Sequence, residues 1–189
     1  MAKILAFSGS IRQDSFNRKL IQVGVDAVKA AGGDVTLLDL RDYPLPIYDG
    51  DLEAQEVPEN ARKLAELCSE YQGLLIASPE YNSGYSPLLK NTIDWITRVK
   101  PGTTTLAPFQ DKFAGLIAAS PGGFGGLRGL LQLRTVLSYI KVHVLHQQAT
   151  ISAAHEAFDE HGKLKNPSFQ KQVDAVAQEL VRILNKVYA

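Results

Sequence analysis

The sequence has little cysteine and no excess of charge. Only one cysteine, Cys68, occurs among 189 residues, which excludes an internal disulfide framework and a cysteine-rich metal site. The 20 basic and 20 acidic side chains cancel, so no overall field favours nucleic acid or an anionic membrane. No apolar run approaches the roughly 20 residues of a membrane-spanning helix. These absences predict a soluble, cytoplasmic protein that binds neither nucleic acid nor membrane, with any bound anion small and locally held.

Short apolar runs alternate with helical patterns along the whole chain. Strands buried on both faces are predicted at residues 4–7, 35–40, 74–77, 113–119 and 142–145. Apolar positions with helical spacing predict helices within residues 17–31, 57–71, 89–96, 127–137 and 173–187. Connections of this length allow parallel crossovers, so we expect a three-layer α/β fold, as a single domain over residues 1–189. Ligands of such folds bind outside the carboxyl ends of the strands.

The loop after the first predicted strand has the composition of an anion site. Residues 8–17 read SGSIRQDSFN, which gathers serine, asparagine and arginine side chains at a helix N-terminus with unpaired N–H groups. The loop lacks the lysine of a Walker motif and the spacing of a dinucleotide turn, which favours a monophosphate. The alternative is ordinary helix capping by Ser15 or Asn17.

The loop after the third predicted strand is suited to a flat heterocycle. Residues 78–87 read SPEYNSGYSP, in which Ser86 is a good N-cap and Pro87 takes the first helical position. In the strand order 2-1-3-4-5 this loop lies beside the first loop, and it offers aromatic faces and free backbone amides there. The alternative is that Tyr81 and Tyr85 only pack over the sheet edge.

Three motifs occur in order along the chain: SGS-x-R-x-x-S-x-N in the first loop, PEYN with LKN-x-IDW in and after the third loop, and SPGGFGG after the fourth strand. Together they resemble the NADPH-dependent FMN reductase family, over roughly residues 3–150. The resemblance implies a flavodoxin-like five-stranded parallel sheet of order 2-1-3-4-5. It also implies an FMN-dependent enzyme that passes hydride from NADPH or NADH to quinones, azo compounds, free flavin or metal ions by a ping-pong mechanism.

The same resemblance implies which residues contact FMN, and no side chain is assigned as catalytic or as a metal ligand. The phosphate would lie against Ser10, Arg12, Ser15, Phe16 and Asn17. The isoalloxazine edge would contact Pro79, Glu80, Tyr81 and Asn82, largely through their backbone. The other side of the cofactor would approach Ser120, Gly122 and Gly123, although that glycine-rich run is also typical of an ordinary turn.

Family members act as homodimers or homotetramers, which implies roles for two further residues. Trp95 lies on a helix that resembles the one building the dimer contact, or it is a core residue. Arg128 matches an arginine used between subunits, or it is a solvated surface residue. Cys68 falls on an apolar helix stripe and is predicted to be packed and inert.

Two other functions stay open at the level of sequence: a flavodoxin-type one-electron carrier and a regulatory module that binds no flavin. The sequence does not choose the acceptor, NADPH over NADH, or dimer over tetramer. The Pro-rich residues 42–51 fit a lid, a partner-binding loop or a plain connection.

Overall fold

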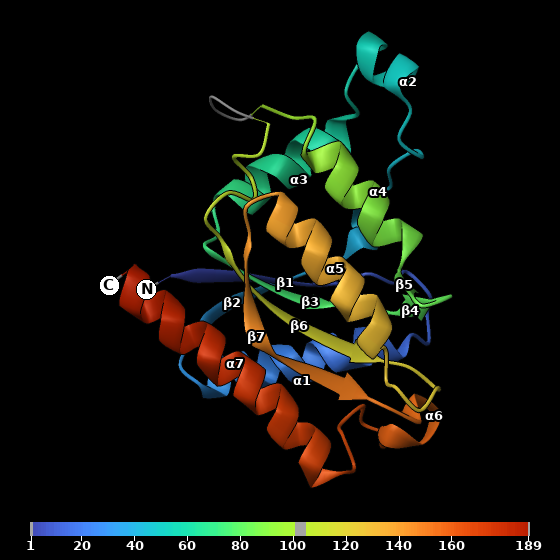
Figure 1. Cartoon of the computed structure of the whole chain (residues 1–189), viewed down its shortest axis with the longest axis vertical. Helices are drawn as coiled ribbons and strands as arrows, with labels where there is room; N and C mark the ends of the chain where they lie inside the picture. The colour runs from blue at the N-terminus through green and yellow to red at the C-terminus, as the bar shows by residue number, and fades with distance from the viewer. Residues whose placement is uncertain (1, 101–104, 189) are drawn as a thin grey trace.

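The chain folds around a five-stranded sheet, seen in a computed structural model that describes residues 2–100 and 105–188 (Figure 1). The strand order is β2-β1-β3-β6-β7, and every neighbouring pair is parallel. In chain order this is the predicted 2-1-3-4-5 arrangement, which confirms the α/β fold class. The strands are β1 Lys3–Ser8, β2 Asp34–Leu38, β3 Gly73–Ala77, β6 Phe113–Ala119 and β7 His143–Ile151.

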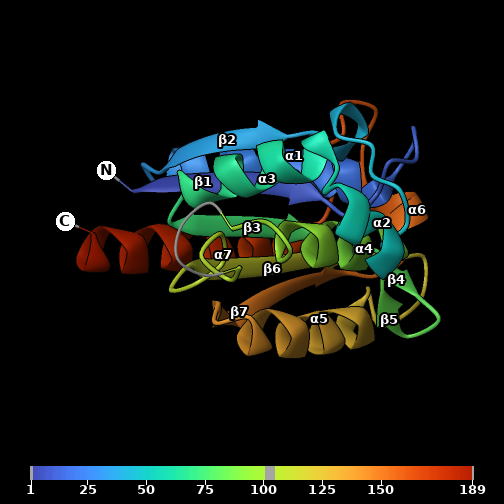
Figure 2. The same cartoon turned by 90° about the horizontal axis from the view of Figure 1, so that it is seen from above.

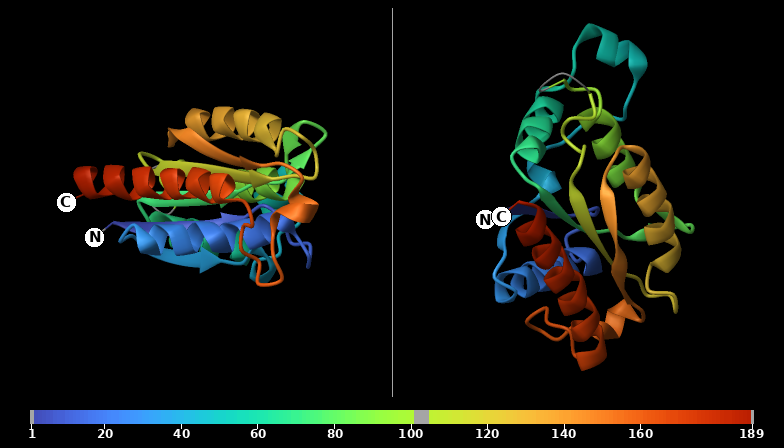
Figure 3. Two further views of the ribbon diagram at one scale, coloured as in Figure 1. Left: turned by 90° about the horizontal axis from the view of Figure 1, so that it is seen from below. Right: turned by 60° about the vertical axis from the view of Figure 1, so that its left-hand side comes forward.

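Helices cover both faces of the sheet. Two of them, α1 (Phe16–Ala30) and α7 (Pro167–Val187), pack together on one face. The other face is covered by α3 (Glu59–Ser69), α4 (Pro87–Ile96) and α5 (Leu127–Tyr139). Figure 1 shows the sheet between the two helical layers, Figure 2 looks onto the face covered by α3, α4 and α5, and the left view of Figure 3 looks onto the face covered by α1 and α7. The predicted three-layer architecture is therefore confirmed.

Side chains of the central strands alternate between two apolar clusters. In β1, Ile4 and Ala6 join the cluster under α1 and α7, whereas Leu5 and Phe7 join the cluster under α3, α4 and α5. A strand that is buried on both faces must be apolar at nearly every position, which explains the unbroken apolar runs in the sequence. Because β1, β3 and β6 run parallel to one another, the loops that leave them all lie at the carboxyl edge of the sheet.

The two outer strands depart from the prediction that every strand is buried on both faces. Most of β2 is exposed, and β7 contains exposed and half-buried side chains as well as buried ones. β7 also continues to Ile151, beyond the predicted end at residue 145, after a register shift that pairs Leu116 with Gln148. An edge strand has a neighbour on one side only and tolerates polar side chains, so the second half of β7 carried no apolar signal.

Several short elements escaped the sequence patterns because they are too short to show a period. They are the 3₁₀ turn η1 (Leu40–Asp42), α2 (Gly50–Gln55), β4 (Glu80–Tyr81), β5 (Gly84–Tyr85) and α6 (Ala154–Ala157). Within residues 2–100 and 105–188, no helix has the length and apolarity needed to cross a membrane.

The Pro-rich residues 42–51 are fastened to α4. Asn91 Nδ2 and Trp95 Nε1 each donate to the carbonyl oxygen of Pro46 at 2.8 Å, and Asn91 Oδ1 accepts the Tyr48 N–H at 2.8 Å. The Tyr48 ring packs edge-on against Trp95, with centroids 5.2 Å apart. Trp95 is fully buried, so the structure favours its interpretation as a core residue. These contacts make the segment a fixed connection in this structure.

Candidate cofactor-binding site

The loops after β1, β3 and β6 enclose a cavity of about 130 Å³ at the carboxyl edge of the sheet. Most of the predicted site residues line it: Ser10, Arg12, Ser15, Phe16, Asn17, Pro79, Glu80, Tyr81 and Ser120, together with Ala119 and Pro121. An adjoining hollow of about 330 Å³ shares Ser10, Arg12 and Tyr81 and extends towards the start of α4. Of the predicted residues, Asn82, Gly122 and Gly123 do not line either space.

The first loop presents hydroxyl groups and backbone amides to this cavity. Ser15 occupies the N-cap position of α1 in an extended conformation, yet among the described residues its side chain makes no capping hydrogen bond. The first N–H groups of a helix have no partner within the helix. The hydroxyls of Ser10 and Ser15 belong to residues only 7% and 3% exposed. Plain capping therefore does not account for Ser15, and the loop fits a small anion.

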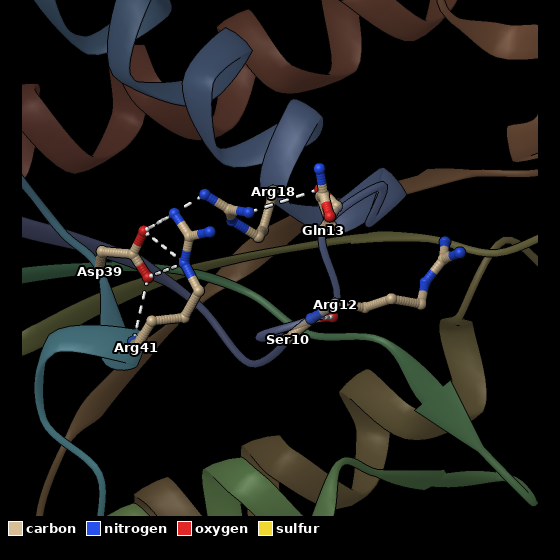
Figure 4. A network of polar contacts seen from close by, with 6 residues as sticks. All are labelled: Ser10, Arg12, Gln13, Arg18, Asp39 and Arg41. Carbon is tan, nitrogen blue, oxygen red and sulfur yellow. Dashed lines mark hydrogen bonds and ion pairs between the residues drawn. The ribbon is translucent and has the colours of Figure 1, made fainter.

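Arg12 supplies a full positive charge at the mouth of the cavity. Its Nη2 donates to the carbonyl oxygen of Asp14 at 2.7 Å, and its guanidinium carbon lies 5.5 Å from the centroid of the Phe16 ring. In Figure 4 the side chain points away from the cluster of Arg18, Asp39 and Arg41. An arginine fixed at two points in this way is oriented before any ligand arrives.

The side-chain amide of Asn17 is not free to donate to a ligand, because it is bonded to another part of the chain. Its Nδ2 donates to the carbonyl oxygen of Ala119 at 2.8 Å, and its Oδ1 accepts the Ala119 N–H at 2.9 Å. The side chain therefore joins the start of α1 to the end of β6, and both of its polar groups are already occupied. Asn17 holds two walls of the cavity together, and its backbone N–H is what it offers to a ligand.

The third loop contains a hairpin in which a two-residue turn joins β4 to β5. The turn residues Asn82 and Ser83 have φ angles of 51° and 67°, as a hairpin turn of this length commonly requires. This turn carries Asn82 beyond the cavity, which explains why it is not among the lining residues. Pro79, Glu80 and Tyr81 lie at the base of the hairpin and face the space.

The carboxylate of Glu80 fastens this hairpin to α5. Arg128 Nε and Nη2 lie 3.0 Å and 2.8 Å from Glu80 Oε1, and the Gly129 N–H donates to Oε2 at 3.1 Å. The Glu80 side chain is only 7% exposed, whereas that of Arg128 is 54% exposed. A carboxylate at the N-terminus of α5 also interacts favourably with the helix dipole. Within this chain Arg128 thus holds the third loop, which neither interpretation from the sequence had foreseen.

Ser86 connects the first loop to α4. Its Oγ donates to the carbonyl oxygen of Gly9 at 2.7 Å and accepts the Leu89 N–H at 3.2 Å, which confirms the predicted N-cap. A Cβ atom on Gly9 would lie 2.5 Å from the Leu89 side chain, so the close approach of the loop to α4 depends on glycine.

The fourth loop needs glycine at positions other than the predicted ones. A Cβ atom on Gly123 would meet nothing within 4 Å. Gly125 and Gly126 instead have φ angles of 59° and 94°, and a Cβ on Gly126 would lie 2.6 Å from Ala118 Cβ. The Gly122 N–H donates to Ser120 Oγ at 3.3 Å. Gly122 and Gly123 stay open and accessible at the rim.

A second charged cluster lies beside the first loop but on its far side (Figure 4). The Arg41 side chain, hydrogen-bonded to Asp39, lowers the pKa of that carboxyl to about 2, and Arg18 Nη2 lies 3.2 Å from the same carboxylate. The nearby Ser8 Oγ is buried and has no hydrogen-bond partner in the part of the chain that the structure describes.

The predicted packing of Cys68 is confirmed, because its side chain is buried in the apolar cluster under α3, α4 and α5. Burial raises the pKa of this thiol to about 12.

Comparison with known proteins gives a consistent result. A family model described as NADPH-dependent FMN reductase matches residues 2–156. An NAD(P)H-dependent FMN reductase from Pseudomonas aeruginosa is 34% identical over 94% of this chain and 92% of its own length. An NADPH:quinone oxidoreductase from Arabidopsis thaliana is 31% identical over 96% and 87%. The solved structure of FerB, a flavoenzyme NAD(P)H:(acceptor) oxidoreductase from Paracoccus denitrificans, aligns with a TM-score of 0.83 at 26% identity, covering 98% of both chains.

Proposed function

Because the chain belongs to the NADPH-dependent FMN reductase family, it is an FMN-dependent NAD(P)H oxidoreductase, and we propose that it binds FMN in the cavity between its first, third and fourth loops. The enzyme class and the cofactor pair expected from the sequence agree with this family. The placement of the cofactor, the order of the reaction and the acceptors are the parts proposed here.

One observation carries the placement: the donor set of the first loop suits a phosphate dianion. Two buried serines, the free N–H groups at the start of α1 and the oriented guanidinium of Arg12 converge on one small space. Charge-assisted hydrogen bonds each contribute about 1.5 to 3 kcal/mol, so several of them hold a phosphate firmly. The residues present therefore fit FMN, with its phosphate on Ser10, Arg12, Ser15 and the backbone of Phe16 and Asn17.

The protein contributes position and polarity to the reaction. When bound, FMN supplies the hydride chemistry. Pro79, Glu80 and Tyr81 would flank the ring through their backbone, and the Glu80–Arg128 ion pair fixes that backbone against α5. Ser120, Gly122 and Gly123 would border the opposite side. There the Gly122 N–H already donates to Ser120 Oγ, and the Gly123 N–H is the one that can stabilise negative charge that develops on the ring.

Donor and acceptor are proposed to use the same open face in turn. Each of the three loops carries an exposed apolar side chain, Ile11, Tyr81 or Phe124, and Ile11 and Tyr81 line the hollow that adjoins the cavity. They leave an accessible, partly apolar mouth that suits flat acceptors such as quinones, azo compounds or free flavin, and metal ions reach the same opening. NAD(P)H binds, gives up its hydride and leaves before the acceptor enters, which is a ping-pong mechanism.

Steady-state kinetics test this proposal. The purified protein is loaded with FMN, and NADPH or NADH oxidation is measured over a matrix of donor and benzoquinone concentrations. Parallel double-reciprocal lines are expected, and intersecting lines would contradict the ping-pong order. A protein that binds FMN but leaves NAD(P)H unreacted while titrating in one-electron steps would instead be a flavodoxin-type carrier.

A homodimer or homotetramer is also proposed, with the groove between α4 and α5 as the contact. This groove encloses about 560 Å³ away from the three loops, and Ile93, Val136 and Tyr139 help to line it. The exposed Leu131 and Tyr139 lie on α5 as well. Light scattering in solution measures the oligomeric state directly.

A single FMN-binding domain over residues 1–189 and a cytoplasmic location stay predictions from the sequence.

A further inference from the structure

The segment after β7 forms a small hairpin held by its own hydrogen bonds. Phe158 and Leu164 form an isolated antiparallel bridge. Between them, Asp159 Oδ1 accepts the N–H groups of His161 and Lys163 at 2.9 Å and 2.8 Å, and the Asp159 N–H donates to the Lys163 carbonyl oxygen at 2.9 Å. These contacts make the 158–164 hairpin a defined support for the side chain of Phe158.

The ring of Phe158 is stacked on the ring of Phe16, over which the guanidinium of Arg12 lies. The rings of Phe158 and Phe16 are 6.4 Å apart and inclined by only 2°, and the Arg12 guanidinium carbon lies 5.5 Å from the Phe16 centroid. Phe16 and Phe158 are both partly buried against the apolar cluster under α1 and α7. A continuous row therefore runs from the hairpin through Phe16 to the guanidinium at the cavity.

We propose that Phe158 is a positioning residue for the phosphate site, because it fixes the Phe16 ring and through it the guanidinium of Arg12. This inference rests on the proposed binding of the FMN phosphate at the first loop. A cation near an aromatic face is attracted by the ring quadrupole, and the attraction depends on how the ring is oriented. An arginine that is ordered beforehand loses less side-chain entropy when an anion binds.

The role of Phe158 is separable from simple packing by the choice of ligand. Riboflavin has the same ring system as FMN but lacks the phosphate. A residue that only supports the fold affects the binding of both flavins, whereas a residue that orients Arg12 affects FMN alone. The ratio of the two dissociation constants therefore isolates the effect of Phe158 on the phosphate.

The test compares FMN and riboflavin dissociation constants, from flavin fluorescence quenching, in four proteins: wild type, Phe158→Leu, Phe158→Tyr and the control Phe169→Leu. Phe169 is also partly buried against the same cluster but is not part of the row. Phe158→Leu should weaken FMN binding by about two- to fivefold and leave riboflavin binding unchanged. Phe158→Tyr, which keeps the ring, and Phe169→Leu should both retain the wild-type ratio.

The inference is overturned if the ratio of the two dissociation constants in Phe158→Leu equals that of the wild type, whether both affinities are unchanged or both are weakened by the same factor. Far-UV circular dichroism establishes that each variant is folded. Phe158→Met repeats the test with a second apolar side chain that has no ring and is unbranched. In an Arg12→Ala background, Phe158→Leu should have no further effect on FMN binding, and an undiminished effect there contradicts the proposed route. A wild-type protein that binds neither flavin would contradict the proposed function itself.

Discussion

Replacing Glu80 by glutamine or alanine should loosen the third loop and weaken flavin binding. The carboxylate is almost completely buried, and it accepts hydrogen bonds from Arg128 and the Gly129 N–H. Breaking a buried ion pair costs about 3 to 5 kcal/mol and breaking an exposed one about 0 to 1 kcal/mol. Because Arg128 is half exposed and can be resolvated, we expect a loss of about 1 to 3 kcal/mol in the free energy of unfolding.

Within this range, Glu80→Ala should lower the free energy of unfolding more than Glu80→Gln does. Glutamine keeps one oxygen that can accept the Gly129 N–H, but an NH2 donor then faces Arg128 in place of the second oxygen. Glu80→Gln therefore removes the charge and the hydrogen bonds to Arg128. Alanine leaves that N–H without its acceptor, and an unsatisfied buried donor costs about 1 to 3 kcal/mol. Urea unfolding measures both values, and a double-mutant cycle with Arg128→Ala isolates the pairwise energy.

Flavin binding gives the second readout for Glu80. The hairpin faces the proposed ring end of the site, so Glu80→Gln should weaken FMN and riboflavin by the same factor. The pair Glu179–Arg182 on α7, with Nε and Oε2 2.6 Å apart, provides a matched control, and Glu179→Gln should leave both flavins unaffected. Additive single-mutant effects at Glu80 and Arg128, or unchanged flavin affinity in Glu80→Ala, would refute the reasoning.

Three further predictions address the phosphate end, the fourth loop and the neighbouring charge cluster. Arg12→Ala should weaken FMN binding about tenfold or more, the loss of a charge-assisted hydrogen bond, and leave riboflavin binding unchanged in the same fluorescence titration. Gly126→Ala should destabilise the fold by about 1 to 3 kcal/mol in urea because a methyl group is forced into a positive φ, whereas Gly123→Ala should not. Asp39→Asn should make the free energy of unfolding depend less on pH in acid. The hydrogen bond with Arg41 lowers the pKa of Asp39 in the folded protein to about 2 from 3.8, so the stability that Asp39 contributes is present above pH 3.8 and is lost as the pH falls through about 2.

The sheet was predictable from the sequence because central parallel strands require apolar side chains on both faces, and a cavity lies at its carboxyl edge as expected for such a fold. β6 was located at residues 113–119, as the structure has it. The outer strands failed the same rule, since β2 and the second half of β7 have only one neighbouring strand and carry polar residues. The apolar pattern of a sequence predicts strands whose side chains are buried, and it fails for strands that are only partly buried.

The roles of individual site residues were less predictable, because they depend on contacts between distant parts of the chain. Asn17 was identified as a site residue, but its bonds to Ala119 cross more than a hundred positions of sequence and carry no local signal. The Glu80–Arg128 pair is of the same kind. Composition indicates which side chains can donate or accept, whereas only the tertiary structure shows which of them are already satisfied within the protein.

The way these contacts are distributed gives the site two ends that can be perturbed independently. Arg12 and Phe158 act on the first loop, where the phosphate is proposed to lie, and Glu80 acts on the hairpin beside the proposed ring position. Variants of the first group should change the ratio of FMN to riboflavin affinity, and variants of the second should change both affinities and keep the ratio. If Glu80→Gln altered the ratio and Arg12→Ala did not, the cofactor would lie in the opposite orientation. The same cavity would then hold the ring against α1 and the phosphate against the hairpin.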